Sequence, residues 1–423
     1  MAWHAFAAVA SGNRRGLLRQ DVTSVEPFDF NPFDEAVRRD PYALYARGRR
    51  ERPVFAHPTF PVVSLFRHQD VQNLLRDPAQ WSNFFPLPPG MERPGDMPPS
   101  MLGVDPPEHT RLRGLVSQAF TPRMIRRLEP RLHAIAHELL DAALRQADVD
   151  LVAALTYPLP VIVIAEMIGI PPADRDRFKA WSDDLVKNLG VGLLTPPTLE
   201  RLEEQRAVIR EMRAYFLRLI EERRSEPRED LLSGLVAAES EGSRLTFDEM
   251  IQTLILLLVA GNETTTNLIG NAVLELLAHP AAMDELRADR GLLPDAIEEV
   301  LRFSSPVQMD PRRATRATEI AGVPVAEDQF VIGWIGSANR DEDVFEHADV
   351  FDIRRKNSRH LAFGFGPHYC LGASLASLEA QVAVGALLER TRSFRRVDDA
   401  PLPLHPSIVF RGVRSLPLQL EAA

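Results

Sequence analysis

A helical pattern of apolar residues runs without a break from Thr246 to about Ala278 and stops just before Pro280. Thr246 and Glu249 have the spacing of a capping box, in which each side chain accepts a hydrogen bond from the other residue's backbone N–H. At about 1.5 Å per residue the helix would measure about 50 Å. A helix of that length could cross the whole molecule.

The middle of this helix contains poor helix formers, in the run Gly261-Asn262-Glu263-Thr264-Thr265-Thr266. The glycine alone should cost about 1 kcal/mol relative to alanine. Because such residues weaken a long buried helix, the run indicates a functional site. The alternative is that Glu263 and Thr264 form a solvated polar patch, or that the threonine bonds back to the carbonyl four residues earlier.

The rest of the chain is predicted to be mostly helical, with sheet as the minority element. Further helices are expected over 109–146 with a turn at Thr121-Pro122, in segments up to about Arg224, and over 294–303 and 373–390. Strands are expected within 40–76, for example Pro61 to Phe66, and within 312–337, where Gly322 and Asp328 mark turns; a closing hairpin is expected over 408–420. No repeat or low-complexity linker indicates a domain boundary.

The composition is that of a globular protein, with 45% hydrophobic and 26% charged residues. A formal net charge of -10 argues against nucleic-acid binding, because phosphate backbones are held by clustered cations. No apolar run has the roughly 20 residues that a membrane-spanning helix needs. The short apolar patch near the N-terminus lacks the preceding Lys or Arg of a secretory signal. We therefore expect a soluble protein that has no membrane partner.

Cys370 is the only cysteine among 423 residues, which excludes internal disulfides and sites built from several cysteines. A reducing cytoplasm is the expected location. Cys370 lies in the glycine-rich run 363–372, just ahead of a predicted helix whose N-terminal dipole favours a thiolate. The glycines let the backbone turn around the sulfur and approach a flat cofactor. An inert buried cysteine and a nucleophile with His368 as its base are the alternatives.

The run Phe363-Gly364-Phe365-Gly366-Pro367-His368-Tyr369-Cys370-Leu371-Gly372, of the form Phe-x-x-Gly-x-x-x-Cys-x-Gly, resembles the heme-binding loop of the cytochrome P450 family. Three further runs match motifs of the family in the family's order. His109 to Arg113 is similar to its heme-propionate helix, Ala260 to Thr265 to its oxygen-activating helix, and Glu299 to Arg302 to its Glu-x-x-Arg helix. The resemblance extends from about residue 30 to the end and looks like that of a bacterial, soluble member.

This resemblance implies a mainly α fold with a small β region, the triangular prism of the cytochrome P450 fold. Heme b would lie between the long helix and the loop of Cys370. Residues 21–423 would form a single domain, preceded by an N-terminal extension of residues 1–20. The implied reaction inserts one oxygen atom from O2 into a hydrophobic small molecule, by hydroxylation or epoxidation.

The family's residue roles can be assigned where the motifs match. Cys370 would be the axial thiolate ligand of the iron, and Glu263 and Thr264 would deliver protons during catalysis. Glu299 and Arg302, three apart on one helix face, would form an ion pair that braces the fold. Propionate contacts would come from His109, Arg113, Arg312 (or its neighbour Arg313) and His360, and other heme contacts from Ala260, Gly261, Phe363, Gly364 and Gly372.

A long proline-rich loop, Ser82 to Pro107, and the wall of the long helix are expected to line an apolar substrate pocket. The residues assigned to the pocket are Phe84, Phe85, Leu87, Met97, Leu257, Val259, Met309 and Ile408. A packed surface loop without a ligand is the alternative. A terpenoid, polyketide or fatty acid would suit such a pocket.

Electrons must come from outside the chain, because it has no flavin or iron-sulfur motif. A ferredoxin with its ferredoxin reductase is therefore the expected donor, and the enzyme is expected to be a monomer. A peroxide-driven oxygenase of the same fold, a heme-binding sensor or carrier without turnover, and a cysteine hydrolase are the alternatives. The pairing of Glu263 with Thr264 argues against the peroxide-driven oxygenase.

Overall fold

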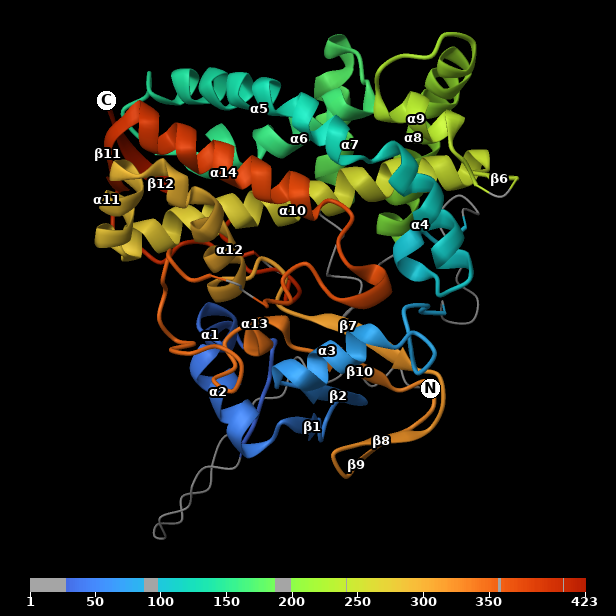
Figure 1. The fold of residues 1–423 in the computed structure, drawn as a ribbon, viewed down its shortest axis with the longest axis vertical. Coiled ribbons are helices and arrows are strands. Elements are labelled where there is room, and N and C mark those ends of the chain that lie inside the picture. The colour runs from blue at the N-terminus through green and yellow to red at the C-terminus, as the bar shows by residue number, and fades with distance from the viewer. Residues whose placement is uncertain (1–27, 87–97, 187–198, 241, 357–358, 406) are drawn as a thin grey trace.

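The structure is a computed structural model that describes residues 28–86, 98–186, 199–240, 242–356, 359–405 and 407–423. Most of the helices are stacked on one another in the upper part of the view, and the larger sheet lies below them together with the N-terminal helices (Figure 1). The extension predicted for residues 1–20 lies outside the described residues. The mainly α architecture with a small β region is confirmed.

The bounds of the elements are as follows. The helices are α1 (Glu35–Arg39), α2 (Tyr42–Glu51), α3 (His68–Arg76), α4 (Glu108–Ala119), α5 (Pro122–Ala143), α6 (Pro158–Ile168), α7 (Arg175–Val186), α8 (Leu199–Ser225), α9 (Leu231–Ala237), α10 (Phe247–Ala278), α11 (Pro280–Ala288), α12 (Leu293–Phe303), α13 (Ile335–Ala338) and α14 (Ala373–Arg390). The strands are β1 (Val54–Ala56), β2 (Val62–Leu65), β3 (Trp81–Ser82), β4 (Val149–Asp150), β5 (Glu239–Ser240), β6 (Ser243–Arg244), β7 (Asp310–Ala314), β8 (Thr318–Ile320), β9 (Val323–Val325), β10 (Phe330–Gly333), β11 (Thr391–Arg396) and β12 (Pro417–Ala422).

The long helix α10 has the bounds that the sequence predicts. Thr246 is its N-cap, and the capping box with Glu249 closes through hydrogen bonds of 3.3 and 2.7 Å. The helix continues through the run of poor helix formers without a break. Helices α6, α12 and α14 pack against it, so tertiary contacts compensate for the weak helix propensity of its middle.

The larger sheet has the strand order β1-β2-β10-β7-β3, in which only β2 and β10 run parallel. Its central strands bring the N-terminal region and the 310–333 region together, as Val331 beside Val63 shows. The strands predicted within 312–337 end earlier than expected, because the residues after β10 form helix α13.

A second sheet has the order β11-β12-β4, and it corrects the prediction of a hairpin over 408–420. The last strand, β12, pairs antiparallel with β11 and with β4 and not with the residues just before it. A local pattern shows that a segment can form a strand, but pairing depends on which distant strand offers a matching edge.

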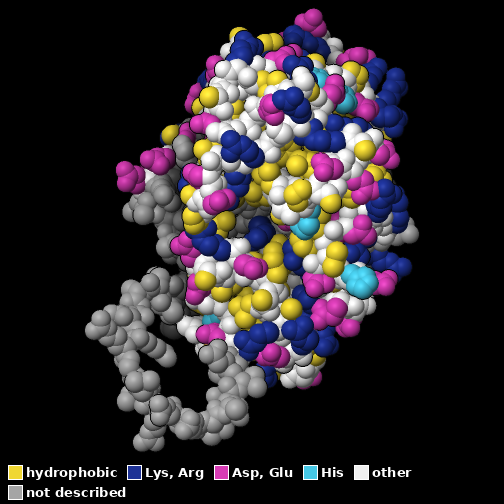
Figure 2. All heavy atoms as spheres, turned by 90° about the vertical axis from the view of Figure 1, so that its left-hand side faces the viewer, with side chains coloured by type: hydrophobic (Ala, Val, Ile, Leu, Met, Phe, Trp, Pro, Cys, Tyr) yellow, Lys and Arg dark blue, Asp and Glu magenta, His cyan; other side chains and the backbone are white. Residues whose placement is uncertain are grey.

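The face that holds α1, α2, α11 and β12 carries charged side chains of both signs. Positive and negative side chains are intermixed there, and smaller groups of hydrophobic side chains lie between them (Figure 2). This face therefore lacks the large positive field that a nucleic-acid surface would need.

The ion pair expected between Glu299 and Arg302 forms within α12, and both side chains are 0% exposed. Arg302 also donates to the carbonyl oxygens of Asn339, Ala348 and Val350. Glu299 accepts further bonds from the Arg355 side chain and the Asp352 backbone. The pair thus fastens α12 to the segment that leads to the cysteine loop.

Replacing Glu299 by Ala should lower the free energy of unfolding by about 3 to 5 kcal/mol, because it leaves the Arg302 charge buried without its carboxylate. Chemical denaturation measures this loss. Glu221→Ala is the matched control, since Glu221 and Arg224 have the same spacing but are 59% and 49% exposed. The control should lose less than about 1 kcal/mol. Equal losses in the two variants would contradict the structural role.

A second buried carboxyl lies where α14 meets α10. Glu379 of α14 is buried, bonds with Thr265 of α10, and has one carboxyl oxygen without a partner in the described part of the chain. Burial raises the pKa of Glu379 from 4.5 to about 8, and the Thr265 hydroxyl offsets only part of this effect. The carboxyl is therefore protonated in the folded protein at neutral pH.

The contribution of Glu379 to stability should fall as pH rises from about 4.5 to about 8, because Glu379 binds its proton more tightly when folded than when unfolded. The contribution is complete below pH 4.5 and is lost as the pH passes the folded pKa, at up to about 1.4 kcal/mol per pH unit. Glu379→Gln removes this slope in denaturation measured at pH 5 to 8. Glu389→Gln, at an exposed position of α14, should retain it; a slope unchanged in Glu379→Gln would contradict the assignment.

Candidate functional site

The loop that carries Cys370 is folded tightly onto itself just before α14. The Cys370 backbone N–H donates to the Phe363 carbonyl at 2.8 Å, which closes the loop. Gly364 and Gly366 have φ values of 74° and 71°, a region that favours glycine. A Cβ at Gly366 would also lie 2.7 Å from the Leu75 carbonyl oxygen, so this glycine lets the loop contact the end of α3.

The thiol of Cys370 keeps an accessible surface, although the protein packs densely around it. Burial raises the pKa of the Cys370 thiol, while a hydrogen bond with the Gly372 backbone and the charge of Arg113 lower it. The predicted effect of the helix N-terminus is therefore outweighed by burial in the protein alone. Binding of a metal to sulfur would favour the thiolate.

Four cationic or titratable side chains gather beside this loop. The ring centroids of His109 and His368 lie 4.0 Å apart. Burial, together with the nearby charges of His109, Arg312 and Arg113, lowers the pKa of His368 to about 3. Burial likewise lowers the pKa of His109, with a contribution from Arg113. We call His109, Arg113, Arg312 and His368 the cation cluster.

The imidazoles of the cation cluster have unused hydrogen-bonding atoms. Nε2 of His109 and both ring nitrogens of His368 are buried and have no hydrogen-bond partner among the described residues. Unpaired buried polar atoms are uncommon in native proteins and call for a missing partner. Carboxylates would satisfy both the imidazoles and the arginines. The cluster therefore fits the two propionates of a heme.

Arg312, and not its neighbour Arg313, belongs to the cation cluster. Arg312 is buried and bonds to Asp310, whereas Arg313, on the other face of β7, bonds to Asp328 and to the Phe84 carbonyl. Strand alternation therefore selects Arg312.

His360 does not join the cluster. Its Nε2 lies 3.0 Å from a carboxylate oxygen of Glu298, and the residue lines a separate concave surface with Phe363 and Gly364. His368 takes the place that the sequence analysis assigned to His360.

The middle of α10 leaves a narrow accessible stripe. Leu257, Ala260, Gly261 and Thr264 share one helix face and keep accessible surface, whereas their neighbours Leu258, Glu263 and Thr265 are buried. The Thr264 hydroxyl donates to the Ala260 carbonyl at 2.7 Å. This is the back-bonded geometry weighed as the alternative role, and it leaves the hydroxyl oxygen free to accept a hydrogen bond.

The other threonines of the run face away from the stripe. Thr265 bonds with Glu379, and Thr266 donates to the Thr156 carbonyl at 3.1 Å. Glu263 is also buried, and its Oε1 lies 2.9 Å from Nε2 of His405 and 3.5 Å from Nδ2 of Asn267. Thr264 and Glu263 are thus adjacent in sequence but lie on different faces of α10.

Gly261 has a packing reason that the sequence analysis missed. A Cβ there would lie 2.5 Å from Cδ1 of Ile164, so the glycine lets α6 approach α10. Close approach to a cofactor is therefore not needed to explain this glycine.

The residues assigned to the substrate pocket fall into three groups. Leu257 and Val259 are partly exposed on α10, and Phe84 is exposed while Phe85 stacks on Phe330. Met309 and Ile408 pack with Phe30, Tyr45, Phe66 and Trp334, and Ile408 also lines a small surface pocket, so their place in a substrate pocket stays a prediction. Apolar residues of this kind fill a core or line a pocket equally well, so sequence alone could not separate the two. Leu87 and Met97 lie outside the described residues.

Three residues of the site region escaped the sequence analysis in these roles: His368, Glu379 and His405. His368 was considered only as a base for Cys370, although its place two residues before the cysteine was a usable signal. The other two carry no local signal, since their partners on α10 are more than 100 positions away.

The described part of the chain contains no helix that is long and apolar enough to cross a membrane.

Comparison with known proteins identifies the family. The sequence model of the family described as Cytochrome P450 matches residues 55–411. Cytochrome P450 107B1 of Saccharopolyspora erythraea is 41% identical over 416 residues, which cover 94% of this chain and 99% of that protein. The putative cytochrome P450 YjiB of Bacillus subtilis is 39% identical over 387 residues, 90% of this chain and 94% of that protein.

Solved structures agree with these sequence matches. CYP109Q5 from Chondromyces apiculatus superimposes with a TM-score of 0.84 at 42% identity, covering 93% of this chain and 98% of that one. CYP109E1 from Bacillus megaterium, solved in complex with corticosterone, gives 0.82 at 37% identity, covering 91% and 99%. The fold, the cysteine loop and these relatives lead to one conclusion: the chain belongs to the cytochrome P450 family and is a bacterial monooxygenase that uses heme b.

Proposed function

We propose that this monooxygenase binds heme b between the accessible stripe of α10 and the loop of Cys370, and oxidises a hydrophobic small molecule with electrons from a ferredoxin system. The observation that carries the proposal is the cation cluster with its unpartnered buried imidazole nitrogens beside the only cysteine. Neither a cysteine hydrolase nor an inert cysteine accounts for such a cluster.

The chain's own residues divide the binding of the cofactor between them. Cys370 supplies the thiolate ligand, and the loop of Phe363, Gly364 and Gly372 lets the backbone lie close to the porphyrin. The cation cluster neutralises the propionates, and bidentate arginine contacts suit those carboxylates. When bound, heme b supplies the activation of O2 that inserts one oxygen atom into the substrate.

Proton supply falls to α10. The Thr264 hydroxyl, fixed by its bond to Ala260, presents its lone pairs on the accessible stripe and so accepts a hydrogen bond from the reacting group or an ordered water. Glu263, buried one residue away, is the nearest carboxyl on the helix and serves as the proton donor of the pair. Solvated-patch behaviour does not suit Glu263, because it is buried and held by His405.

The substrate is proposed to be an apolar molecule such as a terpenoid, a polyketide or a fatty acid. Leu257, Ala260 and Gly261 give the accessible stripe an apolar character next to Thr264. Two structures of one relative support this class, since CYP109E1 was crystallised with corticosterone and with testosterone. The steroids bound to that relative make a polycyclic substrate the first to test.

Four points stay predictions: electron transfer by a ferredoxin and its reductase, a monomeric state, a cytoplasmic location, and the single domain of residues 21–423. The peroxide-driven enzyme and the heme sensor would share the fold, so only turnover separates them from the proposal. Product formed with NAD(P)H, ferredoxin, its reductase and O2 supports the proposal. Product formed with peroxide, but none with NAD(P)H, ferredoxin, its reductase and O2, would favour the peroxide-driven enzyme.

Carbon monoxide added to the reduced protein should produce the strongly red-shifted Soret band of thiolate-bound heme, because the sulfur donates electron density to the iron. Cys370→Ala should lose that band while circular dichroism shows the same helix content. His368→Ala should retain less heme after gel filtration than His347→Ala, whose side chain is 78% exposed. A red-shifted band that survives in Cys370→Ala would exclude the proposed ligand.

Thr264→Ala should reduce the product formed per NAD(P)H consumed by about tenfold or more, since positioned proton transfer contributes on that order. Thr264→Ser keeps the hydroxyl and should restore most of the yield. Thr253→Ala is the matched control. The Thr253 hydroxyl also donates to the carbonyl four residues earlier, that of Glu249, at 2.8 Å, but it lies nearer to the N-terminus of α10. If Thr264→Ala forms as much product per NAD(P)H as the wild type, Thr264 has no role in proton delivery.

A further inference from the structure

Three buried polar side chains form a row along α10: Glu263, Asn267 and Asn271. They are four residues apart, so they lie above one another on one face of the helix. The C-terminal loop, defined here as residues 404–405 and 407–412, covers this row. The Nδ2 of Asn271 donates to the Arg411 carbonyl at 3.0 Å, and a Cβ at Gly412 would lie 1.9 Å from Oδ1 of Asn267.

At the end of the row nearest to Thr264, the C-terminal loop presents His405 to Glu263. Nε2 of His405 lies 2.9 Å from Oε1 of Glu263. The backbone N–H of Ser407 donates to Nδ1 of the same ring at 3.1 Å. Because Nδ1 accepts a hydrogen bond, it carries no hydrogen, so the hydrogen of the neutral ring is on Nε2 and is donated to the carboxylate.

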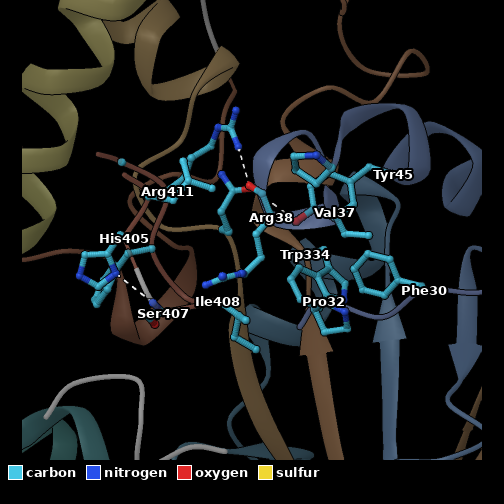
Figure 3. A pocket seen from close by; sticks show the side chains of 15 residues that line it. Phe30, Pro32, Val37, Arg38, Tyr45, Trp334, His405, Ser407, Ile408 and Arg411 are labelled. Atoms are coloured by element: carbon cyan, nitrogen blue, oxygen red, sulfur yellow. Dashed lines mark hydrogen bonds between the residues drawn. The ribbon is translucent and has the colours of Figure 1, made fainter. Parts of the chain in front are cut away.

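The ring of His405 is held on its remaining sides. Phe410 contacts it edge-on, with ring centroids 5.4 Å apart and planes at 90°. Its side chain is 11% exposed and lines a small surface pocket of about 40 Å³ together with Arg38 and Arg411. Figure 3 shows His405 and Ser407 on one side of this pocket, opposite Tyr45, Trp334 and Phe30. The ring thus lies between the surface and the buried carboxylate.

We propose that His405 is a positioning residue for proton delivery, acting through Glu263. Both contacts of Glu263, from His405 and from Asn267, go to Oε1, and the Asn267 contact at 3.5 Å is at the limit of a hydrogen bond. His405 therefore fixes the carboxyl group and leaves Oε2 to exchange a proton. This inference rests on the proposed function, in which Glu263 supplies protons.

Anchoring of the C-terminal loop does not need the His405 side chain. The backbone of the loop is held by the bridge between Leu404 and Val413 and by the bond from the His405 N–H to the Gly412 carbonyl at 3.0 Å. Asn271 adds its bond to Arg411. Loss of the imidazole should therefore disturb Glu263 more than it disturbs the fold.

The test compares His405→Ala, His405→Gln and His279→Ala in the heme-loaded enzyme. His279 is the matched control, because its Nδ1 lies 3.6 Å from a carboxylate oxygen of Glu275 at the far end of α10. His405→Ala should lower the product formed per NAD(P)H by roughly fivefold and raise the solvent deuterium isotope effect, a smaller loss than that of removing the acid itself. His405→Gln retains an N–H donor and should recover most of the yield, and His279→Ala should match the wild type.

A spectroscopic measurement tests the contact without turnover. ¹⁵N NMR of the histidine rings, in the diamagnetic ferrous carbon monoxide complex, should show His405 with its hydrogen on Nε2 and a bare Nδ1. Its signals should shift in Glu263→Gln and stay in place in Glu275→Gln. The proposal would be overturned if the His405 signals do not shift in Glu263→Gln. It would also be overturned if His405→Ala forms as much product per NAD(P)H as the wild type. A wild-type enzyme that forms no product would count against the proposed function alone, since the NMR result still decides whether His405 holds Glu263.

Discussion

The polar side chains buried along α10 set the main constraint on this structure. A buried polar group costs free energy unless it finds a partner, and a helix has used its own backbone groups internally. Several of these side chains therefore find their partners in other segments. Thr265 meets Glu379 of α14, Thr266 meets the Thr156 carbonyl, and Asn271 meets the carbonyls of Ser304 and Arg411. These bonds orient α10 so that Thr264 is left on its accessible face.

Charge imposes a second constraint, beside the cysteine loop. The cation cluster places two arginines and two histidines close together, and their mutual repulsion contributes to the lowered pKa of His368. A fold retains such a cluster when an anion balances it. The heme propionates of this family are such anions, which explains why the chain concentrates positive charge here while its net charge is negative.

A third constraint is the buried ion-pair network around Glu299. Arg302 and Arg355 both bind the Glu299 carboxylate, so the pair expected from a helix spacing becomes a joint between α12 and the segment before the cysteine loop. The helix spacing and the family resemblance predict the pair and its structural role but not its further partners, because the carbonyls of Asn339, Ala348 and Val350 carry no side-chain signal.

The sequence by itself determined the long helix with its capping box, the mainly α architecture and the cysteine loop, because these depend on periodicity, caps and glycines within short stretches of chain. Tertiary structure alone decided which threonine of the run is accessible, that Arg312 and not Arg313 joins the cation cluster, and that β12 pairs with β11. It also packed Met309 and Ile408 against Phe30 and Trp334, and placed His405 against Glu263. These outcomes depend on which distant segments meet, and local patterns do not specify pairing between residues far apart in the chain.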